Sequence, residues 1–192
     1  MKITALYGSP RAGGNTDILM DEFLRGVLAV APDADIKRLH VRDLNIYPCT
    51  ECNACFKTGD CVFDDDMTGI YGRLLESDMV VLAAPVFFYG LPSQLKALVD
   101  RTQALWARKH ILKQDLGRKR AGFFISAGGT KGQSLFDGVK LTAKYFFDAI
   151  NVEYKGERFY QSIDNKGDIR KHPTALPDVF ESGKSMADST EP

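Results

Sequence analysis

Strand-like and helix-like patterns alternate along this chain, and this alternation restricts the possible folds more than any other feature. Apolar runs predict strands at Ile3–Tyr7, Asp35–Arg42, Met79–Ala84, Ala121–Ser126 and Val152–Tyr160. Apolar residues at helical spacing predict helices at Thr16–Val30, Met67–Glu76, Ser93–Trp106, Ser134–Ile150 and Leu176–Met186. Strands that alternate with helices form a parallel sheet covered by helices on both faces. We therefore expect an α/β domain.

The polarity of the predicted strands indicates their order in the sheet. The first, third and fourth strands are the most apolar, and the second, Asp35–Arg42, is the most polar. Central strands of a parallel sheet are buried on both faces, whereas an edge strand is not. The flavodoxin-like order 2-1-3-4-5 places the second strand at an edge. We therefore predict a flavodoxin-like three-layer sandwich with a five-stranded parallel sheet in that order.

The composition is that of one globular domain. The chain has 192 residues, 44% of them hydrophobic, with neither an internal repeat nor an interdomain linker. We expect one domain over residues 1–192, with a cysteine-rich loop at about 47–66 and a flexible tail at 187–192. Lys and Arg together number 25, as do Asp and Glu, which argues against a nucleic-acid partner. The longest apolar run, Met79–Phe88, is too short for a membrane span, so we expect a cytoplasmic protein with reduced cysteines.

A glycine-rich loop joins the first predicted strand to the first predicted helix. It reads GSPRAGGNT, and its candidate phosphate ligands are Ser9, Arg11, Gly13, Gly14, Asn15 and Thr16. The N-terminus of a helix favours anions, and glycines let backbone N–H groups turn inward. The lysine of the nucleotide P-loop is missing, which favours a single terminal phosphate over ATP or GTP. The alternative is an ordinary glycine turn with a good helix cap.

Two further loops follow the third and fourth predicted strands. Ligands of this fold lie beyond the carboxyl ends of the strands, at the switch point between the first and third. An aromatic loop there can cover a flat heterocycle, and a glycine loop can offer backbone amides to its polar edge. The alternative for the aromatic residues is packing against the following helix. The candidate ring contacts are Pro85, Val86, Phe87, Phe88, Tyr89, Gly90, Ser126, Gly128 and Gly129.

The stretches GSPRAGGNT and PVFFYGLPSQLKALVDR resemble the NADPH-dependent FMN reductase superfamily of flavodoxin-like proteins. The resemblance extends from the first predicted strand to the fifth. It implies FMN as cofactor, with the phosphate in the first loop and the isoalloxazine ring at the loops after the third and fourth strands. Asp100 and Arg101 match the Asp-Arg pair that ends the second motif.

All four cysteines of the chain lie in one short segment, as Cys49, Cys52, Cys55 and Cys61. The run C-x2-C-x2-C is typical of [4Fe–4S] sites, whereas structural zinc more often uses two separated pairs. Zinc, and free or disulfide-bonded cysteines, remain alternatives. The iron–sulfur flavoproteins of the same superfamily carry a compact cysteine motif after the second strand. The resemblance therefore implies a [4Fe–4S] cluster here.

Other charged groups have simpler interpretations. The acidic run Asp64–Asp66 is predicted to cap the helix that begins at Met67. The basic run Arg118–Arg120 is predicted to be a solvated loop. The three histidines, His40, His110 and His172, share no metal-binding spacing and are expected at the surface.

The pattern shows neither a general base nor a nucleophile, so the cofactors are expected to carry the chemistry. FMN together with a [4Fe–4S] cluster would couple two-electron to one-electron transfer. A cluster-free NAD(P)H-dependent FMN or quinone reductase and a non-enzymatic flavin-binding module are the alternatives. We expect a homo-oligomer, dimer or tetramer, in which the cluster of one chain faces the flavin of another. NAD(P)H or a ferredoxin-like protein is the expected electron donor.

Overall fold

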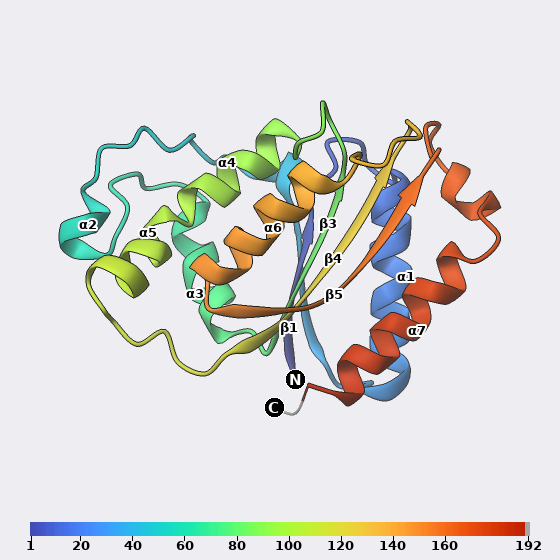
Figure 1. The fold of residues 1–192 in the computed structure, drawn as a ribbon. Helices are drawn as coiled ribbons and strands as arrows, with labels where there is room; N and C mark the ends of the chain where they lie inside the picture. Colours follow the sequence, from blue (N-terminus) through green and yellow to red (C-terminus); the bar gives the residue numbers. More distant parts are fainter. Residues whose placement is uncertain (191–192) are drawn as a thin grey trace.

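The computed structural model describes residues 1–190 and contains, in that part of the chain, a parallel five-stranded sheet in the order β2-β1-β3-β4-β5. This confirms the predicted fold (Figure 1). The strands are β1 (Lys2–Tyr7), β2 (Asp35–His40), β3 (Met79–Pro85), β4 (Arg120–Gly128) and β5 (Val152–Gln161). In β3 every residue except Pro85 is buried, whereas β2 fully buries only Leu39. The most polar strand therefore lies at the edge of the sheet, where only one of its sides is paired with another strand.

Helices cover both faces of the sheet (Figure 1). One face is covered by α1 (Asn15–Val30) and α7 (Ala175–Asp188). The other is covered by α3 (Met67–Glu76), α4 (Ser93–Arg101) and α6 (Asp137–Ala149). Successive strand residues point to opposite faces, so Val81 enters the first core and Val80 and Leu82 enter the second. The sheet thereby separates two apolar cores and gives the three-layer sandwich.

Helices α1 and α7 pack at very short range because glycines line their contact. A Cβ on Gly26 would lie 2.0 Å from the carbonyl oxygen of Phe180, and one on Gly183 would lie 2.0 Å from that of Phe23. Only residues without a side chain allow the two backbones to approach in this way.

The segment predicted as one helix from Ser93 to Trp106 is divided. Helix α4 ends at Arg101, α5 covers Gln103–Trp106, and a π-helical turn covers Ala107–Ile111. At the junction the Thr102 hydroxyl donates a hydrogen bond to the carbonyl of Val99 (2.6 Å). The cysteine-rich loop also contains a short helix, α2 (Cys55–Thr58), which the sequence pattern did not indicate.

The C-terminal helix α7 extends two residues into the segment that we predicted as a tail. It runs to Asp188, and Ala187 is buried. Residues 191–192 of the predicted tail lie outside the described residues. Across residues 1–190, each helix is too short or too polar to serve as a bilayer-spanning segment.

Candidate functional site

A cavity of about 380 Å³ opens at the carboxyl ends of β1, β3 and β4. Three loops that are far apart in the sequence meet there, as expected for this strand order. The lining residues are Ser9, Pro10, Arg11, Gly14, Asn15, Thr16, Pro85, Val86, Phe87, Ala127, Gly128, Gly129, Ile163 and Asp164.

Not every candidate residue lines this cavity. Gly13, Phe88, Tyr89, Gly90 and Ser126 lie outside its lining. The Ser126 side chain is buried within β4 and donates a hydrogen bond to the carbonyl of Ala84 (2.7 Å). Its role in the structure is therefore to join β4 to β3.

The loop after β5 contributes residues that sequence reasoning missed. Ile163 and Asp164 line the cavity, and the Lys166 side chain lies over the glycine-rich loop. A Cβ on Gly13 would be 3.6 Å from Lys166 Nζ. The available signal was the polar stretch Asp164–Gly167, because a turn after a parallel strand must lie at the same edge of the sheet as the other ligand loops.

The glycine-rich loop is held by its own short hydrogen bonds. Ser9 is buried, and its Oγ accepts a hydrogen bond from the N–H of Arg11 (3.1 Å). The N–H of Gly14 donates to the carbonyl of Arg11 (3.2 Å), and Gly13 adopts a left-handed φ of 63°. Helix α1 follows at once, so its unpaired N–H groups and the positive end of its dipole lie beside the cavity. This arrangement suits an anionic group.

The Asn15 side chain is committed to the loop after β5. Its Oδ1 accepts hydrogen bonds from the N–H groups of Gly167 (2.9 Å) and Ile169 (3.3 Å). Its Nδ2 donates to the carbonyl of Asn165 (2.9 Å). The side chain that we expected at a phosphate therefore joins the two loops that bound the cavity, and one Nδ2 hydrogen is already used.

A buried carboxylate lies directly behind the glycine-rich loop. Asp17 Oδ2 accepts hydrogen bonds from the N–H of Gly13 (3.0 Å) and from Arg42 Nη1 (2.9 Å). Burial raises the pKa of Asp17, and Arg42 opposes that rise. Arg42 Nη1 also donates to the carbonyl of Ser9 (3.3 Å). Arg42 therefore offsets the negative charge of Asp17 and keeps the loop suited to an anion.

The aromatic loop after β3 forms a tight turn. The N–H and C=O groups of Phe87 and Gly90 are paired at 2.9 and 2.8 Å. The two central residues, Phe88 and Tyr89, have φ values of 47° and 61°. Left-handed backbone costs a non-glycine residue about 1–3 kcal/mol and is frequent at ligand clamps. Phe87 lines the cavity, whereas Phe88 is fully exposed.

A second cavity, of about 510 Å³, is lined by all four cysteines. Cys49 and Cys52 are exposed, Cys55 and Cys61 are half-buried, and none of the four forms a disulfide with another residue among those described. Burial raises the pKa of the Cys55 thiol, and the charges of Cys61, Cys49 and Cys52 raise it further. Cys55 therefore lies within electrostatic reach of the other three cysteines.

The donor set of this cavity fits an iron–sulfur cluster in its chemistry. Four thiols converge on it without a competing histidine, as such clusters require. Within residues 1–190, however, no three His, Cys, Asp or Glu side chains are close enough together to hold a metal ion. The thiols share a cavity but are not drawn together around one point.

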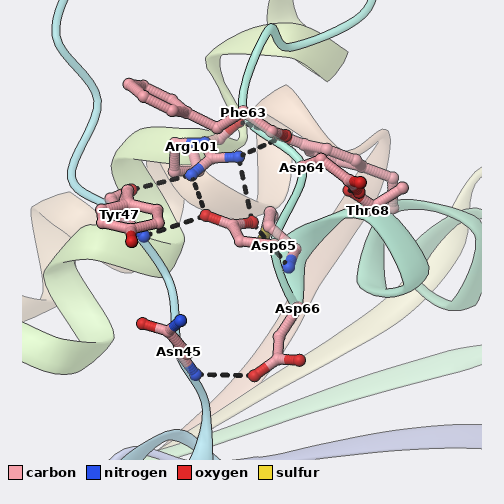
Figure 2. A network of polar contacts seen from close by, with 10 residues as sticks. Asn45, Tyr47, Phe63, Asp64, Asp65, Asp66, Thr68 and Arg101 are labelled. Atoms are coloured by element: carbon pink, nitrogen blue, oxygen red, sulfur yellow. Dashed lines mark hydrogen bonds and ion pairs between the residues drawn. The ribbon is translucent and has the colours of Figure 1, made fainter.

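A buried ion pair fastens both ends of the cysteine-rich loop (Figure 2). Arg101 Nη1 donates to Asp65 Oδ2 (2.6 Å), and Nη2 donates to Asp65 Oδ1 (3.2 Å). Both side chains are only 1% exposed. The same guanidinium donates to the carbonyls of Tyr47 (2.8 Å) and Phe63 (3.5 Å). Arg101, which matched the Asp-Arg motif, therefore belongs to the cysteine cavity rather than to the first cavity.

The acidic run before α3 does not cap that helix in the predicted way. Asp66 is the N-cap residue and makes no side-chain cap hydrogen bond, whereas Asp65 Oδ1 accepts the N–H of Met67, the first helical residue (3.0 Å). Asp65 Oδ2 also accepts the N–H of Tyr47 (2.9 Å), and Asp66 accepts that of Asn45 (2.6 Å; Figure 2). Although burial raises the pKa of Asp65, the hydrogen bonds from Arg101, Tyr47 and Met67 hold it below its usual value.

A second arginine holds the middle of the cysteine-rich loop. Arg108 lies in the π-helical turn, a feature frequent at functional sites. Its Nε donates to the carbonyl of Gly59 (2.8 Å), and Nη2 pairs with Asp60. Both contacts lie between Cys55 and Cys61, so the loop is fixed at its centre as well as at its ends.

The structure corrects one prediction about charged side chains. Arg120 is buried at the start of β4 and donates to the carbonyls of Leu75 and Ile150, so a solvated loop is wrong for this residue. The three histidines are half-buried, so part of each side chain lies at the surface. His40 packs on Tyr7 with ring centroids 4.3 Å apart, and His172 Nδ1 accepts the N–H of Ala175 at the start of α7.

Fold and cavities together define a doubly wound α/β protein with a glycine-rich loop at its switch point and a separate cysteine cavity. The profile of the NADPH-dependent FMN reductase family matches residues 1–151, and the chain belongs to this family.

The following three proteins are among those that are similar to the chain. The iron-sulfur flavoprotein of Methanosarcina thermophila is 35% identical over 133 residues, which cover 68% of this chain and 65% of that protein. Iron-sulfur flavoprotein MJ1083 of Methanocaldococcus jannaschii is 37% identical over 105 residues, 55% of this chain and 53% of that protein. The match thus spans less than two thirds of either relative. The FMN-dependent NADH-azoreductase of Bacillus anthracis, solved in complex with FMN, shares the fold at 14% identity, with a TM-score of 0.70 and coverage of 97% of this chain and 99% of that one.

Proposed function

We propose that this protein is an FMN-dependent oxidoreductase whose flavin binds in the cavity at the carboxyl ends of β1, β3 and β4. The observation that carries the proposal is the meeting of the glycine-rich loop, at the N-terminus of α1, with the loops after β3 and β4. A volume of about 380 Å³ lies within the usual range of cofactor pockets. Membership of the FMN reductase family supports FMN as the ligand.

The cavity suggests a division of roles among its residues. The backbone of the loop over 9–16 would bind the phosphate together with the side chains of Ser9, Arg11 and Thr16, and Lys166 would add positive charge. The ring would lie between the loops after β3 and β4, against Val86, Phe87 and Gly128–Gly129. Asn15 would act by holding the loop after β5 in place.

We further propose a [4Fe–4S] cluster held by Cys49, Cys52, Cys55 and Cys61. Three observations support the cluster. The four cysteines line one cavity, and the other three raise the pKa of Cys55. The chain is also similar to iron-sulfur flavoproteins. When both groups are bound, the flavin supplies two-electron chemistry and the cluster one-electron chemistry. The protein would bind and orient both groups, and a reducing cytoplasmic compartment would keep the thiols free to bind the cluster. NAD(P)H or a ferredoxin-like protein would be the electron donor.

The flavin part is tested by extracting the cofactor from the purified protein. We expect one non-covalent FMN per chain, and FAD or the absence of flavin would contradict the proposal. Steady-state NAD(P)H oxidation distinguishes an enzyme from a module that merely binds flavin.

A single substitution tests the position of the phosphate. Arg11→Ala should weaken FMN binding to the apoprotein by about 1.5–3 kcal/mol, because it removes a charge-assisted contact. Arg25→Ala is the matched control, since Arg25 lies in α1 and pairs with Glu22 instead of lining the cavity. Equal affinities for the two variants in a flavin-fluorescence titration would refute this placement.

The cluster part is tested by iron and acid-labile sulfide analysis of protein purified without oxygen. We expect about four irons per chain in the wild type, the content of a [4Fe–4S] site. Replacement of all four cysteines by alanine should remove the iron and leave FMN bound. The same iron content in both proteins would refute the assignment of the cluster to these cysteines, and a wild type without iron would support the cluster-free reductase.

A further inference from the structure

The Arg101 guanidinium is fixed with one of its edges left without a partner. Nη1 and Nη2 bind the two oxygens of Asp65 end-on, and they also reach the carbonyls at the two ends of the cysteine-rich loop (Figure 2). Nε is buried, and no hydrogen-bond acceptor for it exists among residues 1–190. A buried donor without an acceptor destabilises the folded protein, because it has lost its hydrogen bonds to water. Such a group needs an explanation.

The surroundings of Arg101 contain sulfur. Arg101 lines the cavity that holds all four cysteines. Tyr71 is a direct neighbour of Arg101, because its hydroxyl donates a hydrogen bond to the backbone carbonyl of Arg101 (2.9 Å). Burial raises the pKa of the Tyr71 phenol, Arg101 opposes this rise and Cys61 adds to it. Burial lowers the pKa of Arg101, but Asp65, Tyr71 and Cys61 raise it above its usual range. Arg101 and Cys61 line the same cavity, and Tyr71 is hydrogen-bonded to Arg101.

We infer that Arg101 is a positioning residue for the proposed cluster, and that its Nε–H would donate a hydrogen bond to a sulfur of the bound cluster. This inference rests on the cluster of the proposed function. Hydrogen bonds to cluster sulfurs favour the more negative, reduced form and so raise the reduction potential. Asp65 supplies the complementary part, because its end-on pairing with Nη1 and Nη2 fixes the guanidinium plane and leaves Nε without an acceptor among the described residues.

Lysine cannot reproduce this arrangement. Its ammonium is a single point charge, so it can pair with Asp65 but cannot at the same time present a second donor on a fixed plane. Arg101→Lys therefore separates the two roles of the side chain. The charge next to Asp65 remains, whereas the hydrogen bond to sulfur is lost.

The experiment compares the wild type, Arg101→Lys and Arg108→Lys after anaerobic reconstitution with iron and sulfide. Arg108 holds the same loop, but its Nε already binds the carbonyl of Gly59, so Arg108→Lys controls for a general loosening of the loop. FMN content and circular dichroism check the fold of each variant. Iron content and the midpoint potential of the cluster are the readouts.

We expect Arg101→Lys to bind FMN and iron but to have a more negative cluster potential than both the wild type and Arg108→Lys. A tenfold change in the reduction equilibrium corresponds to about 59 mV for one electron. Equal potentials in iron-loaded wild type and Arg101→Lys would overturn this inference and leave the cluster in place. A shift of the same size in Arg108→Lys would also overturn it. A wild type that takes up no iron would overturn the cluster and this inference together.

Discussion

At the scale of single residues, Asp65 links pH to the stability of the cysteine-rich loop. Its pKa is held below the usual value, so the unfolded chain takes up a proton at a higher pH than the folded one. The stability that the carboxylate contributes is fully present above the ordinary Asp pKa of about 3.9, and it is lost as the pH falls through the folded value.

Asp65→Asn should lower the free energy of unfolding by about 3–5 kcal/mol at neutral pH, because Arg101 stays buried without its partner.

Urea denaturation of the wild type and Asp65→Asn at several pH values checks this expectation. The difference between them should shrink as the pH is lowered, since the wild-type carboxyl then becomes neutral too. Asp64→Asn is the control, because Asp64 is exposed and its contact to Thr68 is long, at 3.4 Å. If the difference in the free energy of unfolding stayed constant down to acid pH, the negative charge of Asp65 would not contribute to stability.

At the scale of elements, the contact between α1 and α7 depends on the absence of side chains. Gly26→Ala should destabilise the protein by about 1–3 kcal/mol, because the new Cβ would lie 2.0 Å from the carbonyl oxygen of Phe180 and force the helices apart.

Gly72→Ala in α3 is expected to have the opposite effect on stability. No atom lies within 4 Å of a Cβ there, so the better helix propensity of alanine should stabilise the protein by about 0.5–1 kcal/mol.

Thermal unfolding of both variants distinguishes packing from propensity. If both changes raised the melting temperature, helix propensity would dominate at both positions. The short approach of α1 and α7 would then not restrict the choice of residue.

At the scale of the whole molecule, the two cavities share no lining residue among those that the structure describes. Electron transfer between them would therefore benefit from a second chain that brings one cavity to the other. Exposed apolar side chains are available for such a contact at Phe88, Tyr89, Leu141 and Tyr145. We expect a dimer or tetramer in sedimentation, and dissociation by Phe88→Asp, because a charge at a buried contact is costly.

The same substitution leaves the flavin cavity intact, since Phe88 does not line it. FMN content of the Phe88→Asp variant should therefore equal that of the wild type. A wild type that sediments as a monomer at all concentrations would refute an oligomer with cofactors facing across its interface.

The sequence by itself determined the architecture and the place of the ligand loops. Strand polarity is a local property that reports burial, so the polar second strand indicated an edge and the apolar third strand a centre. Carboxyl ends of parallel strands meet at one edge, so the positions of the loops followed from the strand order. The cysteine spacing likewise placed four thiols around one cavity.

Only the tertiary structure decided the partners of individual polar groups. Asp65 and Arg101 are 36 residues apart, and Asn15 and Gly167 are 152 apart, so no local pattern could pair them. The same holds for Arg120, which the sequence placed in solvent and the fold buried against two carbonyls. Burial of apolar groups depends mainly on their own residue type, whereas a buried charge is stable only where distant segments supply its partners. The sequence therefore predicts where a site lies, and folding decides which side chains serve it.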